Sequence, residues 1–126
     1  MRNALLAKCE IFEHLFTASR IEEMIEHFYA EDATLEGLDL PAQRGRSAII
    51  KIFAEARSSY REISINLDPV HVHGDIAFGG ITNVNVLIDN RTEIHRGQMI
   101  WRKIDGEWFV QSDFFFPQCE TYLVLA

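Results

Sequence analysis

The sequence lacks the features that mark several classes of protein. Lysine and arginine together number 12 against 19 aspartates and glutamates, which gives a formal net charge of −7. Without a basic face to displace counterions from phosphates, we expect neither nucleic acid nor an anionic membrane surface as a partner. No polybasic run, internal repeat or low-complexity segment interrupts the chain, so residues 1–126 are expected to form one domain.

Cysteines and long apolar runs are also scarce. The two cysteines, Cys9 and Cys119, lie near opposite ends of the chain and cannot make a disulfide framework. We therefore expect free thiols in a reducing cytoplasm. The first residues pass directly into an amphipathic stretch, and no apolar run is long enough to span a bilayer. The expectation is a cytoplasmic protein with neither a signal peptide nor a membrane span.

The first half of the chain has helical periodicity. Ser19 and Glu22 have the spacing of a capping box at the start of the second of three expected helices. A short strand over residues 33–36 and a turn over residues 41–45 are expected to join the second helix to the third. Apolar residues recur at helical spacing in three stretches, residues 4–17, 20–30 and 47–58.

The second half of the chain has the alternation of strands instead. Asp68-Pro69 interrupts the first alternating stretch, which indicates a bulge or bend. The whole pattern predicts an α+β domain in which three N-terminal helices pack on one face of an antiparallel four-strand meander, with one further short strand. The alternating stretches are residues 63–72, 76–88, 91–103 and 107–116.

The residues that face inward depend on the first hairpin turn. A two-residue turn at Asp89-Asn90 would pair Val84 with His95 and direct the even-numbered residues of that strand inward. Asn83 and Asn85 would then face outward, on the same side of the sheet as Ile94, Arg96, Gln98 and Ile100. The inward residues of the next strand would be His95, Gly97, Met99 and Trp101.

The second hairpin leaves two alternatives for Asp113. A three-residue loop over residues 104–106 would set Gly97 opposite Asp113, which would then face inward and lie diagonal to His95. A two-residue turn at Asp105-Gly106 would instead direct Asp113 outward. The pattern alone does not decide between them, because apolar residues occupy both faces of this strand.

Four stretches of the chain carry a resemblance to a known family: residues 28–36, 45–53, 75–77 and 100–108. They resemble the nuclear transport factor 2-like superfamily, in its SnoaL-like and ketosteroid-isomerase-like branch. The resemblance covers about residues 8–117 and implies a cone-like fold with an internal pocket, and a homodimer formed through the outer face of the sheet. Its motifs are specific for the fold and much less so for function.

The resemblance also implies which residues would act. The general-base Asp of the isomerases corresponds here to Gly37 and their oxyanion-hole Asp to Met99, so steroid-type isomerisation is not expected. The limonene epoxide hydrolase branch carries an acid followed by two aromatics on its last strand. Asp113-Phe114-Phe115 is similar to that run, and the similarity favours the three-residue loop and an inward Asp113.

An acid among aromatics is costly to bury unless it is paired or used. We therefore expect a small-molecule-binding protein, a lyase, isomerase or hydrolase in which Asp113 is the general acid or base and His95 is its partner. The ligand is expected to be a small apolar or carbonyl-bearing molecule, held without a cofactor or metal. Its expected contacts are Phe12, Phe16, Phe28, Val84, Met99, Trp101, Gln111 and Phe115.

The alternative is a non-catalytic ligand-binding or dimerisation module, in which Asp113 and His95 form a buried pair that only specifies packing. An open cavity lined by Asp113 would favour the enzyme, and a filled one the module. His71 and His73 share a strand face but lack a third metal ligand at a useful spacing. The apolar residues 122–125 of the tail are expected to pack on a sheet edge or a partner.

Overall fold

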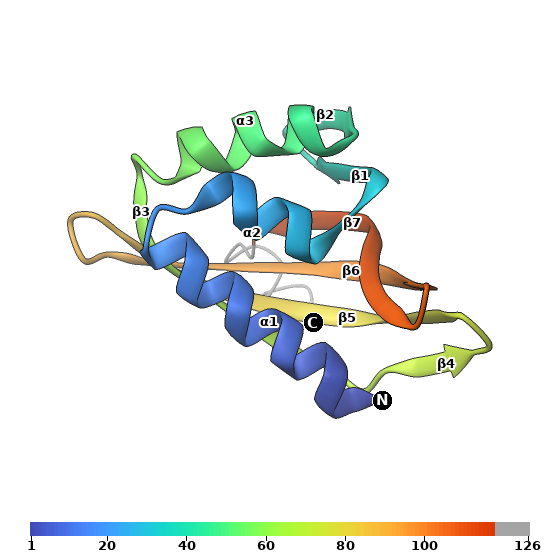
Figure 1. The fold of residues 1–126 in the computed structure, drawn as a ribbon. Helices are drawn as coiled ribbons and strands as arrows, with labels where there is room; N and C mark the ends of the chain where they lie inside the picture. The colour runs from blue at the N-terminus through green and yellow to red at the C-terminus, as the bar shows by residue number, and fades with distance from the viewer. Residues whose placement is uncertain (118–126) are drawn as a thin grey trace.

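The structure, a computed structural model, describes residues 1–117, and within them three helices cover one face of a curved sheet (Figure 1). The helices are α1 (Arg2–Thr17), α2 (Ile21–Phe28) and α3 (Arg46–Ala56). The strands are β1 (Tyr29–Gly37), β2 (Leu40–Arg44), β3 (Tyr60–Leu67), β4 (His71–His73), β5 (Ile76–Leu87), β6 (Thr92–Ile104) and β7 (Glu107–Pro117). The α+β class with helices on one face is as the sequence predicts.

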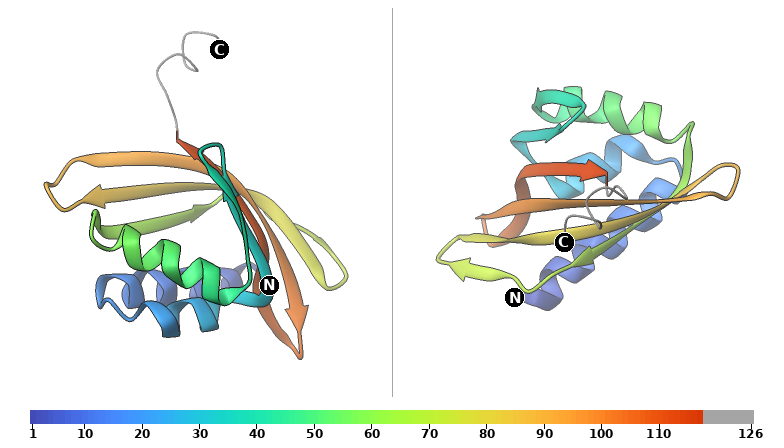
Figure 2. Two further views of the ribbon diagram at one scale, coloured as in Figure 1. Left: turned by 90° about the horizontal axis from the view of Figure 1, so that it is seen from above. Right: turned by 180° about the vertical axis from the view of Figure 1, so that it is seen from behind.

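The strands form one seven-stranded sheet in the order β2-β1-β7-β6-β5-β3, with β4 paired to the N-terminal end of β5. The predicted meander is present as β5, β6 and β7, with β3 beside β5. The sheet has two more strands than the five predicted, because β2 replaces the turn expected over residues 41–45 and the stretch predicted over residues 63–72 divides into β3 and β4. The short strand expected over residues 33–36 is present as the longer β1, which runs parallel to β7. Figure 2 shows the sheet curving over the helices.

The junction between α1 and α2 corrects the predicted capping box. Ser19 adopts the left-handed conformation, with φ 61°, and donates its backbone N–H to the carbonyl of Phe16. Arg20 donates its N–H to Leu15 in the same way, so this pair of residues closes the end of α1. The N-cap of α2 is Arg20, without a side-chain cap bond. Ser19 ends one helix, so it cannot adopt the extended conformation that begins the next.

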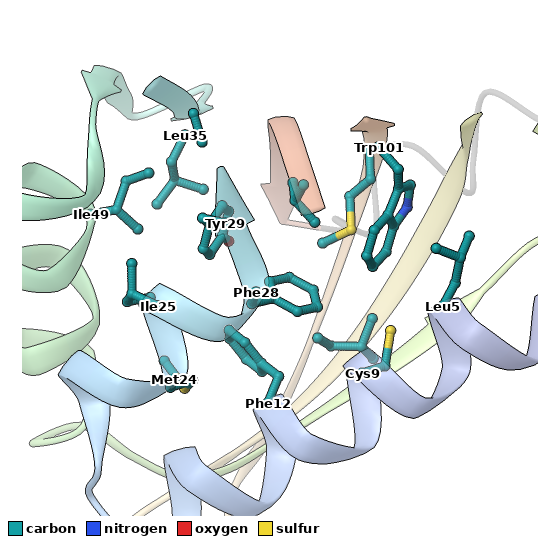
Figure 3. Close-up of a cluster of buried hydrophobic side chains, with 14 of the residues drawn as sticks. Leu5, Cys9, Phe12, Met24, Ile25, Phe28, Tyr29, Leu35, Ile49 and Trp101 are labelled. Atoms are coloured by element: carbon teal, nitrogen blue, oxygen red, sulfur yellow. The ribbon is translucent and has the colours of Figure 1, made fainter. Parts of the chain in front are cut away.

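The core lies between the inner faces of the helices and the middle of the sheet (Figure 3). Phe28 is fully buried and contacts Phe12 at a ring-centroid distance of 4.6 Å and Trp101 at 5.4 Å. Cys9 is a buried free thiol, and burial chiefly raises its pKa to about 12. Cys119 and the apolar tail segment 122–125 lie outside the described residues. No helix in the described part of the chain is both long and apolar enough to cross a membrane.

The hairpin between β5 and β6 has a three-residue loop instead of the predicted two-residue turn. Leu87 donates its N–H to the carbonyl of Arg91, and Asn90 takes the left-handed position with φ 71°. One extra loop residue shifts the register by one, so Asn83, not Val84, lies opposite His95. The odd-numbered residues of β5 therefore face the helices, and the predicted even-numbered face is wrong.

The hairpin between β6 and β7 combines features of both alternatives. Its turn has two residues, Asp105 and Gly106, both with positive φ. Trp101 is opposite Val110, but beyond this point the register shifts by one, and Met99 is opposite Asp113. The extra residue is a β-bulge. It returns Asp113 to the inner face, where the side chain is only 6% exposed, although the turn is the one expected to direct it outward.

Candidate functional site

A cavity of about 140 Å³ lies between the helices and the inner face of the sheet. Its wall is mostly apolar, and its polar side chains form two groups. Asp113 and Tyr29 form the first group, which we call the acid end. Asn83, Asn85 and His95 form the second, with Tyr60 beside them, and we call it the amide end. The apolar wall includes Phe12, Phe28, Leu35, Phe53, Ile63, Ile65, Met99 and Phe115.

The acid end is a buried carboxylate with one hydrogen-bond donor. Tyr29 Oη donates to Asp113 Oδ2 at 2.7 Å, and the two residues are 1% and 6% exposed. Burial raises the pKa of Asp113 to about 6, although the hydrogen bond from Tyr29 acts in the opposite direction. Burial also raises the pKa of Tyr29 well above its ordinary value. Asp113 therefore changes protonation state near neutral pH, as a general acid or base must.

Tyr29 is brought to this position by the junction of α2 and β1. It is the C-cap of α2 and already has extended dihedral angles, φ −103° and ψ 143°. Its carbonyl accepts a hydrogen bond from Arg46 Nε at 2.9 Å, which ties the junction to α3. Because β1 then runs parallel to β7, with Leu35 opposite Asp113, the tyrosine ring lies beside the acid. Figure 3 shows Tyr29 and Phe28 projecting into the core from this junction.

The amide end is built from neighbouring positions on β5 and β6. Asn83 lies opposite His95 and Asn85 opposite Glu93. Glu93 Oε1 accepts a hydrogen bond from the Tyr60 hydroxyl and lies 3.3 Å from His95 Nε2. The pKa of Glu93 is lowered, chiefly by the hydrogen bond from Tyr60. The pKa of Tyr60 is raised to about 12, chiefly by burial. The Oδ1 atoms of Asn83 and Asn85 are buried without a partner in the part of the chain described.

The predicted pairing of Asp113 with His95 is wrong. Asp113 lies opposite Met99, whereas His95 lies opposite Pro117, four residues farther along β7. Four residues of a strand span about 13 Å. The prediction assumed that Gly97 pairs with Asp113. The two-residue turn and the bulge in β7 each shift that register by one position, so the acid lies opposite Met99 instead. Both residues still line the cavity, but at different ends.

The eight residues predicted to contact a ligand divide into two groups. Phe12, Phe28, Met99 and Phe115 line the cavity. The other four do not. Phe16 and Trp101 are buried in the core, and Val84 is on the outer face of β5 because of the longer loop. Gln111 lies outside the cavity lining, where its Nε2 is 3.1 Å from Asp32 Oδ1.

Sequence reasoning missed Tyr29 and the two asparagines. Asn83 and Asn85 alternate along an apolar strand, which is the signal of a polar stripe on one face. A one-residue error in the predicted loop length placed both asparagines on the outer face of the sheet. Tyr29 is 84 residues from Asp113 in the sequence and meets it through a parallel strand pair. No local pattern shows such a pair.

No group of metal-ligating side chains suited to an ion is present among residues 1–117. His71 and His73 are exposed on β4. The ring of His71 stacks on Phe78, with centroids 5.3 Å apart. This contact gives His71 a packing role at the edge of the sheet.

Comparison with known proteins supports this architecture. The family model of the SnoaL-like domain matches residues 10–111. No curated protein matches the sequence.

Three solved structures illustrate the similarity of fold. A ketosteroid isomerase-like protein from Erwinia carotovora atroseptica has a TM-score of 0.75 and 15% identity, over 93% of this chain and 95% of that one. A protein of unknown function from Mycobacterium tuberculosis has a TM-score of 0.81 and 21% identity, over 98% and 75%. A protein described as a dehydratase of the nuclear transport factor 2-like family, from Streptomyces avermitilis, has a TM-score of 0.72 and 14% identity, over 92% and 95%. At these identities the similarity concerns the fold alone.

Proposed function

This chain belongs to the SnoaL-like domain family, and on that premise we propose that its cavity binds a small, largely apolar carbonyl compound on which Asp113 moves a proton. The observation that carries the proposal is the buried carboxyl of Asp113, which lines an apolar cavity and has a pKa raised to about 6. A carboxyl in such surroundings costs stability, and acids with a pKa raised in this way are concentrated at functional sites.

The chemistry requires one free carboxylate oxygen. Asp113 Oδ2 accepts the bond from Tyr29, and Oδ1 has no hydrogen bond to the rest of residues 1–117. Ionised Asp113 would take a proton from the carbon next to the carbonyl group. The C–H electrons would then form a carbon–carbon double bond, and the carbonyl π electrons would move to oxygen.

The fate of that proton would set the overall reaction. In a substrate with a double bond between the β and γ carbons, the electrons would return from oxygen and the γ carbon would take the proton, which completes an isomerisation. In a substrate with a hydroxyl group on the β carbon, the returning electrons would form a double bond between the α and β carbons. The hydroxyl group would take the proton and leave as water, which completes a dehydration. Structural neighbours described as isomerase-like and as a dehydratase support this range of reactions. The two outcomes share one first step, so the step itself is the part to test.

Tyr29 would be a positioning residue for this step. Its bond to Oδ2 fixes the plane of the carboxyl and lowers the pKa of Asp113 against the effect of burial. A larger fraction of Asp113 is therefore ionised at neutral pH than burial alone would allow. His95 lies at the amide end and has no part in this proton transfer.

The test is hydrogen–deuterium exchange at the methyl group of acetophenone, followed by NMR in deuterium oxide. Acetophenone carries one ring and a carbonyl with acidic neighbouring hydrogens. We expect the protein to catalyse the exchange, with a rate that rises with pH through about 6 and then levels, because only ionised Asp113 accepts the proton. Asp113→Asn should reduce the catalysed rate about 10²- to 10⁴-fold. Asp39→Asn, a change at an exposed residue, is the matched control.

An Asp113→Asn variant that exchanges the methyl hydrogens at the wild-type rate would exclude the proposal. A different result separates the two readings of the cavity. If acetophenone binds but no exchange depends on Asp113, the protein is a binding module of the same fold and not an enzyme.

We further propose that the chain forms a homodimer through the outer face of the sheet. Phe78 and Ile100 pair across β5 and β6 on that face, and each is more than 40% exposed. Ile94 on β6 is exposed as well, and apolar side chains gathered in this way suit an interface. Phe78→Lys combined with Ile100→Lys should convert a dimer to a monomer in analytical ultracentrifugation. A wild-type chain that sediments as a monomer would refute the assignment.

A further inference from the structure

Asn83 and Asn85, at the amide end, are polar side chains of the cavity that the proposed proton transfer does not use. Asn85 is only 8% exposed, and both asparagines line the cavity. Neither side-chain Oδ1 has a hydrogen-bond partner among residues 1–117. Most buried polar side chains in folded proteins are paired. Two unpaired amides side by side on one cavity wall therefore indicate a missing partner.

The neighbours of the asparagines define what that partner is. His95 lies directly opposite Asn83, and its Nε2 faces Glu93, which also accepts a bond from Tyr60. The ring of His95 is thus held in place beside the two amides. An amide offers both a donor and an acceptor, and the assignment of its oxygen and nitrogen can be exchanged. A hydroxyl group, which donates and accepts at once, complements this set.

The lack of a cationic side chain among the described residues of the cavity argues against an anionic group on the ligand. No lysine or arginine lines the cavity in the described part of the chain, and Glu93 and Asp113 are the nearest carboxylates at its two ends. A carboxylate or phosphate would therefore enter without a cation to pair with, which is costly in a buried site. A neutral group is favoured.

The dimensions limit the rest of the ligand. The cavity of about 140 Å³ is close to the roughly 150 Å³ cavity that holds benzene in an engineered protein. Asp113 and His95 lie four strand positions apart, about 13 Å along the sheet. Side chains reach inward from both ends of that span. One ring with a short polar substituent at each end fits between them.

We propose that Asn83, Asn85 and His95 bind a hydroxyl group on the ligand, so that the substrate class is a hydroxyl-bearing monocyclic carbonyl compound. The hydroxyl lies at the amide end and the carbonyl at the acid end. The assignment of the carbonyl rests on the proposed function, whereas the assignment of the hydroxyl rests on the unpaired amides.

Three probes of one shape test this proposal: acetophenone, 4-hydroxyacetophenone and 4-acetylbenzoate. Their dissociation constants are measured by NMR titration, in a buffer where the phenol is neutral. We expect 4-hydroxyacetophenone to bind about ten times more tightly than acetophenone, because its hydroxyl satisfies amides that acetophenone leaves unpaired. We expect 4-acetylbenzoate to bind most weakly of the three.

Leucine variants test whether the preference for the hydroxyl compound depends on the two asparagines. Asn83→Leu and Asn85→Leu should each reduce the preference for the hydroxyl compound to less than about threefold, while binding of acetophenone is retained. The ligand-free variants should also melt at a higher temperature than the wild type, because a buried unpaired amide has been replaced by an apolar group. If the asparagines were needed for the fold, the leucine variants would melt at a lower temperature than the wild type. Asn66→Leu is the matched control, since Asn66 is an exposed residue of β3 whose amide bonds Thr82 O.

Several results would overturn the proposal. Equal affinities of the wild type for acetophenone and 4-hydroxyacetophenone would mean that the amides hold only water. The proposal would also be excluded if 4-acetylbenzoate bound most tightly of the three probes, or if no probe bound at millimolar concentration. It would be excluded as well if the preference for the hydroxyl compound survived in both leucine variants. Failure of the exchange assay is a separate result. A hydroxyl preference without exchange would refute the catalytic proposal and leave the amide end as described.

Discussion

Two tyrosine–carboxylate pairs lie at opposite ends of this cavity, and the same kind of hydrogen bond accompanies opposite shifts of pKa in them. Tyr29 donates to Asp113 and Tyr60 donates to Glu93. The pKa of Asp113 is raised to about 6, whereas the pKa of Glu93 is lowered. The difference is exposure, since Asp113 is 6% exposed and the Glu93 side chain 44%.

The comparison shows which effect dominates at each end. At the acid end, loss of hydration outweighs the bond from Tyr29, and the carboxyl is destabilised in its charged form. At the amide end, water still reaches Glu93, so the hydrogen bond decides. One end therefore holds an acid ready to exchange a proton, and the other holds a fixed negative charge that orients His95.

The largest effect is expected from Gly97→Ala, because Gly97 lies on β6 between the two ends. A Cβ at this position would be 2.2 Å from the carbonyl oxygen of Phe114, on the backbone of β7. We expect the free energy of unfolding to fall by about 3 kcal/mol, measured by urea denaturation. Gly74→Ala is the control, because the space around Gly74 is open and only its positive φ opposes a side chain. A loss no greater than in this control would show that β6 and β7 can separate there.

Asp113→Asn should raise stability by up to about 3 kcal/mol at pH 7.5, the free energy that corresponds to a pKa raised from 3.8 to about 6. Between these two values the folded protein binds more protons than the unfolded chain. The wild type therefore loses stability as pH rises through about 6, and the variant does not. Below the unfolded pKa of 3.8 the difference should disappear. The measurement is the free energy of unfolding of both proteins from pH 3.5 to 7.5, and a difference independent of pH would contradict the assignment.

Tyr29→Phe should destabilise the protein by about 1 to 2 kcal/mol at neutral pH, because a buried carboxylate loses its partner. The same change should raise the pKa of Asp113 further, since the bond from Tyr29 is the one influence that lowers it. The check is an NMR titration of the Asp113 carboxyl carbon. A pKa that falls or stays constant would show that Tyr29 does not donate to the acid.

Tyr60→Phe should have the smallest effect, a loss of about 0.5 kcal/mol, because the Glu93 carboxylate remains in contact with water. The pKa of Glu93 should rise toward its ordinary value, and the stability difference should shrink as pH falls and Glu93 is protonated in both proteins. Chemical denaturation at pH 7 and pH 3.5 measures the stability difference, and an NMR titration of the Glu93 carboxyl carbon measures the pKa. A loss as large as that of Tyr29→Phe would remove the distinction between the two ends.

Much of the fold could be predicted from the sequence, because helices and most strands have local periodicity. The three helices, and the order of β5, β6 and β7, follow from it. The pairing of β1 with β7 could not be predicted, since it joins segments from opposite ends of the chain and has no short turn to fix it. That pairing brings Tyr29 to Asp113.

The site was less predictable than the fold because it depends on counting single residues. Asp113 could be identified as a candidate from its aromatic neighbours alone. Its inward direction depends on an extra residue in a strand that is apolar on both faces, where alternation carries no information. The face of Asn83 and Asn85 depends in the same way on a third loop residue, Asn90 in the left-handed position. An error of one residue in either place makes the prediction assign side chains of the pocket to the outer surface of the sheet, and the reverse.

The bulge in β7 also has a consequence for how this protein could change over evolution. Straightening the bulge at constant chain length would move every residue from 112 onward by one position against β6 and exchange the inner and outer faces there. Asp113 would then leave the cavity, and Phe114 would enter it, without any change of a residue in this part of β7. Loss of the codon for Gln111 would instead remove the bulge and keep Asp113 opposite Met99. Two relatives with the same residues here, one with the bulge and one without it, would differ in chemistry.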